Sequence, residues 1–101
     1  MGRRERPLAE DGGVVTRFAA GLRKLRADAG KPTFRELARR AHYAAGTLSE
    51  ATGGKKLPTL AVTTAFVRAC GGDVRAWEAH WRAADAALAT ERDEEQAAPG
   101  D

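Results

Sequence analysis

The sequence is poor in the residues that build covalent scaffolds and reactive centres. Cys70 is the only cysteine among the 101 residues, so no disulfide can form within the chain. The two histidines, His42 and His80, stand 38 positions apart, and the carboxylates clustered at 91–95 belong to a segment without periodicity. Neither glycine pair, at 53–54 or 71–72, has the spacing of a nucleotide-binding loop. We therefore expect no enzyme activity, no metal and no cofactor.

Long apolar runs are absent as well. No segment approaches the ~20 apolar residues that cross a bilayer. The cluster of Arg3, Arg4 and Arg6 is not followed by the apolar core of a signal peptide. We therefore expect a cytoplasmic protein with no membrane partner. A chain of 101 residues suits one small domain.

Negative charge is scarce in the first three quarters of the chain. Residues 1–75 contain 15 Lys and Arg against 7 Asp and Glu, a balance of +8, whereas residues 76–101 contain 2 against 7, a balance of −5. A basic body followed by an acidic tail suits a domain that meets a polyanion. A solvated surface gives the same composition, so composition leaves these two interpretations level.

Apolar residues recur with helical spacing from about Val15 onward, and no stretch alternates with a period of two. The first stripe has steps of four, three and four residues, at Phe18, Leu22, Leu25 and Ala29. Gly30 is placed to cap this helix, and Pro32 prevents its continuation. Residues 1–13 carry the arginine cluster, Pro7 and a glycine pair, which predicts a flexible basic arm.

Two short helices are predicted next. Thr33 and Glu36 have the spacing of a capping box, which starts a helix that runs to about Ala41. A second helix begins near 44–46 and ends at the glycine pair 53–54. We expect Ala38 to face Leu48 where the two helices approach each other. His42 stands four residues after Ala38, at the bend, and histidine is among the non-glycine residues enriched at positive φ. This pattern indicates a helix-turn-helix, although an ordinary pair of antiparallel helices remains an alternative.

Two further helices complete an all-α, five-helix prediction. Thr59 caps a helix that buries Leu60, Phe66, Val67 and Cys70. Asp73 caps the last one, whose apolar positions are Val74, Trp77, Trp81, Ala84 and Leu88. Residues 90–101 lose this periodicity and predict an acidic disordered tail or linker. The helix-turn-helix domain should therefore occupy residues 14–89.

The chain resembles the Cro/C1-type (XRE-family) helix-turn-helix domains, especially those at the N-terminus of actinobacterial regulators. The resemblance covers about residues 15–85 and is carried by FRELARRA at 34–41, TLSEATGGKKLPTL at 47–60 and AFVRACGGDVRAWEAHW at 65–81. It implies a lambda-repressor-like five-helix bundle, binding to double-stranded DNA and a role in transcriptional regulation. It also implies that outward residues early in the third helix read base edges.

The predicted DNA-binding residues fall into two groups. The positions expected to face bases are Ala44, Ala45, Gly46, Ser49 and Glu50. Arg, Lys, Asn and Gln are the strong base readers, and none of them occurs in this group. The positions expected to contact phosphates are Thr33, Arg35, Thr47, Thr52, Lys55 and Lys56. From this composition we expect limited direct readout of the bases and binding mainly through phosphate contacts.

Two questions of partnership stay open at this stage. The bland surface of the third helix also suits a protein–protein interaction adaptor that keeps the fold without sequence-specific DNA binding. Trp77, Trp81 and Leu88 share one face of the last helix. The two tryptophans are expected to cover the core, and a partly exposed Trp81 with Leu88 would give a homodimer contact.

Overall fold

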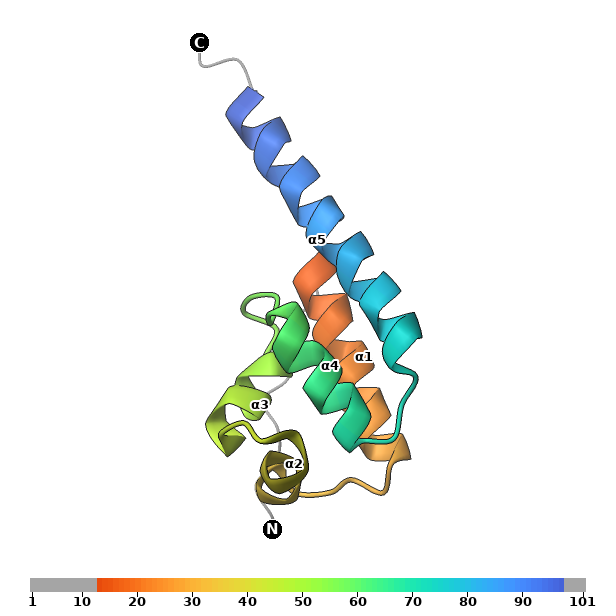
Figure 1. Cartoon of the computed structure of the whole chain (residues 1–101). Coiled ribbons are helices and arrows are strands. Elements are labelled where there is room, and N and C mark those ends of the chain that lie inside the picture. Colours follow the sequence, from red (N-terminus) through yellow and green to blue (C-terminus); the bar gives the residue numbers. More distant parts are fainter. Residues whose placement is uncertain (1–12, 98–101) are drawn as a thin grey trace.

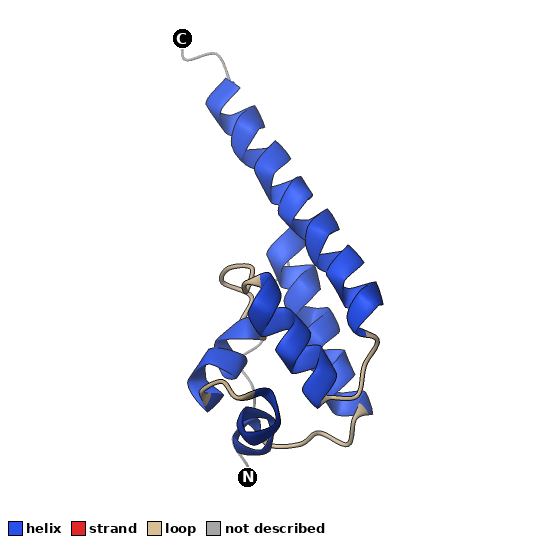
Figure 2. Cartoon of the chain, in the orientation of Figure 1, coloured by secondary structure: helices blue, strands red, loops and turns tan. Residues whose placement is uncertain are grey.

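The computed structural model describes residues 13–97, which form five α-helices and no strand. The helices are α1 (Val14–Asp28), α2 (Phe34–Ala41), α3 (Ala45–Ala51), α4 (Leu60–Ala69) and α5 (Val74–Ala97). α1 and α5 lie side by side, α4 contacts α2, α3 and α5, and the α2–α3 pair forms the end opposite the free end of α5 (Figures 1 and 2). The all-α, five-helix prediction is confirmed.

The predicted helix boundaries depend on local signals that the structure retains. Gly30 follows α1 with a φ of 93°, and the Lys31 amide donates to the Arg26 carbonyl over 2.9 Å, which closes the helix end. The hydroxyl of Thr59 accepts from the Val62 amide at the start of α4. The carboxylate of Asp73 accepts from the Ala76 amide at the start of α5. Each predicted cap is therefore confirmed.

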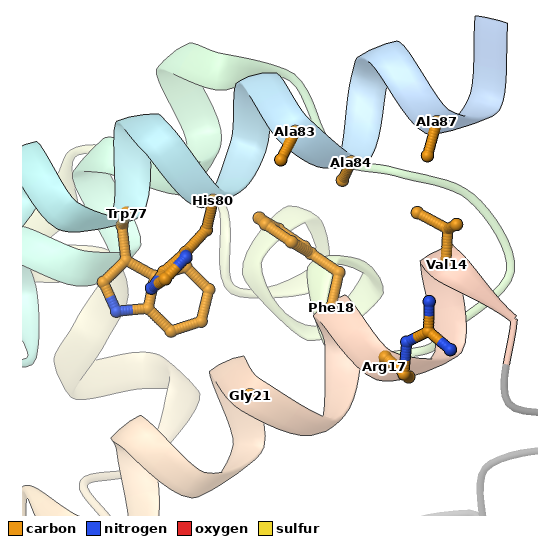
Figure 3. A pocket seen from close by; sticks show the side chains of 9 residues that line it. All are labelled: Val14, Arg17, Phe18, Gly21, Trp77, His80, Ala83, Ala84 and Ala87. Atoms are coloured by element: carbon orange, nitrogen blue, oxygen red, sulfur yellow. The ribbon is translucent and has the colours of Figure 1, made fainter. Parts of the chain in front are cut away.

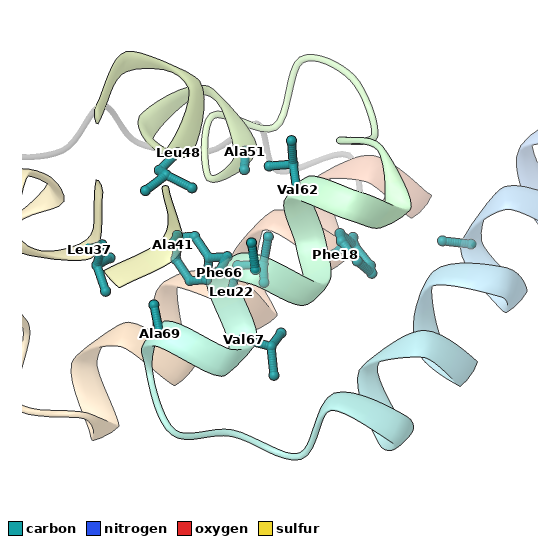
Figure 4. Packing of buried hydrophobic residues seen from close by; sticks show 12 residues of the cluster. Phe18, Leu22, Leu37, Ala41, Leu48, Ala51, Val62, Phe66, Val67 and Ala69 are labelled. Atoms are coloured by element: carbon teal, nitrogen blue, oxygen red, sulfur yellow. The ribbon is translucent and has the colours of Figure 1, made fainter. Parts of the chain in front are cut away.

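The core lies between α4 and the other helices. Leu22, Leu37, Leu48, Phe66 and Val67 are fully buried and come from the first four helices (Figure 4). α5 adds Ala84 and lays Val74, Trp77 and Trp81 against this cluster. The predicted burial of Leu60 and Cys70 is only partial, because both side chains lie at the edge of α4 and stay half-exposed.

The predicted end of the last helix near residue 89 is wrong, because α5 continues to Ala97. The apolar stripe does stop near Leu88, but nothing interrupts the backbone, since the sequence has no Gly or Pro between Asp73 and Pro99. Ala, Glu, Arg and Gln are strong helix formers and extend the helix without a core to pack on. Residues 1–12 of the predicted arm and 98–101 of the predicted tail lie outside the described residues.

Candidate nucleic-acid interface

The bend between α2 and α3 has the geometry that the sequence predicts. His42 has φ 62° and ψ 37°, the left-handed region, and its amide donates to the Ala38 carbonyl over 2.9 Å. Tyr43 is half-buried and packs against the core beneath the bend. Ala44 then precedes α3 in an extended conformation without a side-chain cap, as expected for a poor capping residue. Ala44 and Gly46, on either side of the first residue of α3, are exposed to solvent.

The start of α2 carries the predicted capping box. The Glu36 amide donates to the Thr33 hydroxyl over 3.0 Å, and the Thr33 amide donates to the Glu36 carboxylate over 2.9 Å. The hydrogen bond from the Thr33 backbone lowers the pKa of Glu36, and the charges of Arg40 and Arg39 act in the same direction. Thr33 and Arg35 are both exposed, so this end of α2 is accessible to an anion.

The outward face of α3 is exposed but carries small side chains. Ala44, Gly46, Ser49 and Glu50 are exposed, whereas Ala45 and Thr47 are half-buried. A Cβ atom built on Gly46 would have no neighbour within 4 Å, so the surface there is open rather than filled. Four of the five predicted base-facing residues are therefore exposed, and all of these except Glu50 have short side chains or none.

Thr52 does not belong to this exposed set, and its prediction as a phosphate contact is corrected. Its exposed fraction is 3%, and its hydroxyl donates to the Ser49 carbonyl over 2.8 Å. Its own carbonyl accepts from Nε of Arg23 over 2.9 Å. Thr52 therefore closes the end of α3, and its hydroxyl hydrogen is used within the helix end rather than offered to a phosphate.

A groove of about 520 Å³ follows the carboxyl end of α3. Its walls come from four parts of the chain: α1, the start of α2, the end of α3 and the loop before α4. The lining residues are Arg23, Phe34, Ser49, Glu50, Thr52, Gly53, Lys55 and Lys56. The groove therefore brings together four predicted and exposed site residues, Ser49, Glu50, Lys55 and Lys56. Thr33, Arg35, Ala44, Ala45, Gly46 and Thr47 do not line it.

Sequence reasoning missed three residues of this groove, Arg23, Phe34 and Gly53. Arg23 and Phe34 are half-buried and lie within α1 and α2, and Gly53 belongs to the glycine pair that follows α3. Phe34 carries the guanidinium of Arg26 over its ring at 4.2 Å from the centroid, and Nε of Arg26 donates to the Pro32 carbonyl over 2.7 Å. The spacing of residues along the chain does not show that the middle of α1 lies beside the end of α3. The position of Arg23 in the groove can therefore be seen only in the tertiary structure.

A second groove of about 450 Å³ separates α1 from α5 (Figure 3). The Phe18 and Trp77 rings meet edge to face across it with centroids 5.4 Å apart. Four residues after Trp77, Nε1 of Trp81 donates to the Pro58 carbonyl over 2.7 Å. The tryptophans thus hold α5 on the body of the domain, which agrees with the expectation that they cover the core.

The one cysteine of the chain, Cys70, lines neither groove. Cys70 is half-buried, and this burial raises the pKa of its thiol against the opposing charges of Arg26 and Arg40. Among the side chains that the structure describes, residues 13–93, no group of His, Cys, Asp and Glu could hold a metal ion. Within residues 13–97, every helix is too short or too polar to cross a membrane.

A family model described as a helix-turn-helix domain matches residues 17–81, more than half of the chain. The chain belongs to the helix-turn-helix domain family. This membership agrees with the resemblance to Cro/C1-type domains and indicates DNA as the partner. The match runs from α1 into α5 and so includes the α2–α3 pair and the whole groove lining. No curated protein and no solved structure matches the chain significantly.

Proposed function

We propose that this domain binds double-stranded DNA as part of a bacterial transcriptional regulator in the cytoplasm, and that phosphate contacts supply most of its affinity. The observation that carries this proposal is the placement of Lys55 and Lys56 on the groove that borders the exposed face of α3. A helix that enters the major groove needs cations beside it to hold its position on the duplex. Thr33, Arg35 and Thr47 are proposed to add contacts at the start of α2 and along α3. The family to which the chain belongs acts by binding rather than by catalysis.

Direct base readout is proposed to be limited to a few positions. Ala45 can touch a thymine methyl group, and Glu50 can accept a hydrogen bond from a cytosine amine. Ser49 is a weak and tolerant reader, while Ala44 and Gly46 allow close approach without discrimination. The remaining sequence preference would then come from groove shape and DNA deformability.

Useful affinity with such a small footprint requires pairing, and we propose a homodimer that uses the face of α5 with Trp77, Trp81 and Leu88. All three side chains are half-buried, and Leu88 is not among those packed against the core. Two half-sites would then lie roughly 34 Å apart, one turn of the double helix.

The test is a salt series of fluorescence anisotropy measurements on pooled genomic fragments. We expect binding that weakens steeply with salt, and the double substitution Lys55→Gln and Lys56→Gln should flatten the logarithmic slope by about two units because two counterion-releasing contacts are lost. The matched control is Lys24→Gln with Arg92→Gln, which removes two exposed cations that do not line the groove. The proposal would be contradicted if the wild-type protein bound none of the fragments at low salt.

A second candidate function is an interaction adaptor that keeps the fold without reading DNA. The small side chains on the exposed face of α3 favour it, because strong base readers are missing there. This alternative predicts that changing Lys55 and Lys56 to Glu leaves function intact, whereas substitutions on the α5 face with Trp77, Trp81 and Leu88 abolish it. A pulldown of protein partners, run beside the DNA selection, distinguishes the two functions.

A further inference from the structure

Arg23 is the cation that links α1 to the proposed DNA-binding groove. It is half-buried, its Nε donates to the Thr52 carbonyl over 2.9 Å, and it lines the groove with Lys55 and Lys56. Thr52 is the C-cap of α3, so its carbonyl is one of the helix-end acceptors that the helix itself leaves unpaired. One hydrogen bond from Arg23 satisfies it.

If Arg23 served only to stabilise the fold, the single N–H donor that bonds to the Thr52 carbonyl would be enough. A guanidinium has five N–H groups and keeps its charge in any protein environment, so the bond to Thr52 uses one donor and leaves the charge unchanged. Three cationic side chains, Arg23, Lys55 and Lys56, line the groove together with one carboxylate, Glu50. The lysines are exposed and long, whereas the hydrogen bond to Thr52 fixes the direction of Arg23.

We infer that Arg23 is a phosphate-contacting residue, the preoriented member of a three-cation site with Lys55 and Lys56 for neighbouring phosphates of the DNA backbone beside the carboxyl end of α3. This inference rests on the proposed DNA-binding function and adds a contact from outside the α2–α3 pair. Arginine suits this position because its planar fork binds phosphate through two parallel hydrogen bonds.

Two substitutions separate the charge of Arg23 from its hydrogen bond to Thr52. Gln carries its amide nitrogen on Cδ, the atom that carries Nε in Arg, so Arg23→Gln keeps a donor for the Thr52 carbonyl and removes the charge. Arg23→Lys has a methylene at that place, so it keeps the charge and loses the donor. The control is Lys24→Gln, since Lys24 is the next residue of α1, pairs with Asp28 over 3.0 Å and does not line the groove.

The first measurement is DNA affinity against salt for these variants. For Arg23→Gln we expect the slope to fall by about one unit and affinity to fall about tenfold near 0.1 M salt, the effect of one lost phosphate contact. Arg23→Lys should keep the wild-type slope. A purely structural role predicts the reverse, with Arg23→Gln close to wild type and Arg23→Lys impaired, and this result would overturn the inference. So would equal losses in Arg23→Gln and Lys24→Gln. Thermal unfolding of each variant checks that the folded state persists.

A second measurement keeps failure of this inference distinct from failure of the proposed function. Inorganic phosphate is titrated at constant ionic strength while nitrogen–proton spectra follow the Arg23 side-chain Nε–H and the Lys55 amide. We expect saturable shifts at both in the wild type and a much weaker response of Lys55 in Arg23→Gln. If phosphate shifted these signals but the protein did not bind DNA, the anion site would be supported and the proposed function would be wrong. If the protein bound DNA and Arg23→Gln left that binding unchanged, only the inference about Arg23 would be wrong. If neither phosphate nor DNA bound, the inference and the proposed function would both be wrong.

Discussion

Trp81 provides the sharpest test of how α5 is held on the domain. Its Nε1 donates to the Pro58 carbonyl over 2.7 Å, and this carbonyl lies in the loop that joins α3 to α4, 23 residues away in sequence. Trp81→Phe keeps an aromatic ring but removes the donor, which leaves a part-buried carbonyl without its partner. Such a loss costs about 1–3 kcal/mol of unfolding free energy. In a domain of this size each kcal/mol corresponds to roughly 4–8 °C in Tm, so we expect a fall of about 10 °C.

The matched control is Trp77→Phe, the same change one helical turn earlier. Trp77 meets Phe18 edge to face, and a phenyl ring keeps part of that contact. Urea unfolding followed by circular dichroism should therefore rank Trp81→Phe as the less stable variant by about 1 kcal/mol or more. If the two variants were equally stable, the stabilising role given to the Trp81–Pro58 hydrogen bond would be refuted. The measurement is made at two protein concentrations, because a homodimer would make stability depend on concentration.

Three further predictions concern single features of the fold. Thr33→Ala should lower the unfolding free energy by about 1 kcal/mol through loss of the α2 cap, while Thr33→Ser should keep most of it in the same urea assay. Because the folded pKa of Glu36 lies below its ordinary value of 4.5, its stabilisation is fully present above that pH and is lost as the pH falls through the folded pKa. The stability difference between wild type and Glu36→Gln should vanish over that acidic window. Gly21→Ala would place Cβ 2.9 Å from the Trp77 ring, so we expect about 1–3 kcal/mol of destabilisation in thermal unfolding, or displacement of that ring seen in its fluorescence.

The features predicted correctly from sequence depend on residues close together along the chain. The capping box joins Thr33 and Glu36, which are three positions apart, and the caps at Thr59 and Asp73 act over the same distance. The bend at His42 follows from its place after an apolar helix pattern and from the tolerance of histidine for positive φ. Local chemistry fixes these positions, so the sequence is sufficient to predict them.

The features that were not predicted correctly from the sequence depend on tertiary structure or on the absence of a helix-ending residue. Apolar periodicity shows which residues pack on a core, and its loss after Leu88 does not end a helix that lacks Gly or Pro. The predicted end of α5 is therefore wrong. The burial of Thr52 and the groove position of Arg23 depend on a hydrogen bond between residues 29 positions apart. Neither can be inferred from spacing along one helix.

The structure also changes what the charge balance means. Three arginines of the basic body donate to carbonyls at or next to helix ends: Arg23 to Thr52, Arg26 to Pro32 and Arg40 to Ala69. Thr52 and Ala69 stand at the carboxyl ends of α3 and α4, which attract cations. Arg26 and Arg40 make such hydrogen bonds but do not line the groove, so the balance of +8 in residues 1–75 overstates the charge placed at the groove. The salt dependence should therefore follow the groove rather than the composition.

If Arg23, Lys55 and Lys56 make the main phosphate contacts, the logarithmic salt slope should be about −3 for each monomer, and about −5 for a dimer with both half-sites filled. Arg35 would add roughly one unit per monomer. A slope close to the whole charge of the basic body would mean that cations outside the groove carry the binding. It would also mean that the placement of Lys55 and Lys56 beside α3 does not explain the affinity.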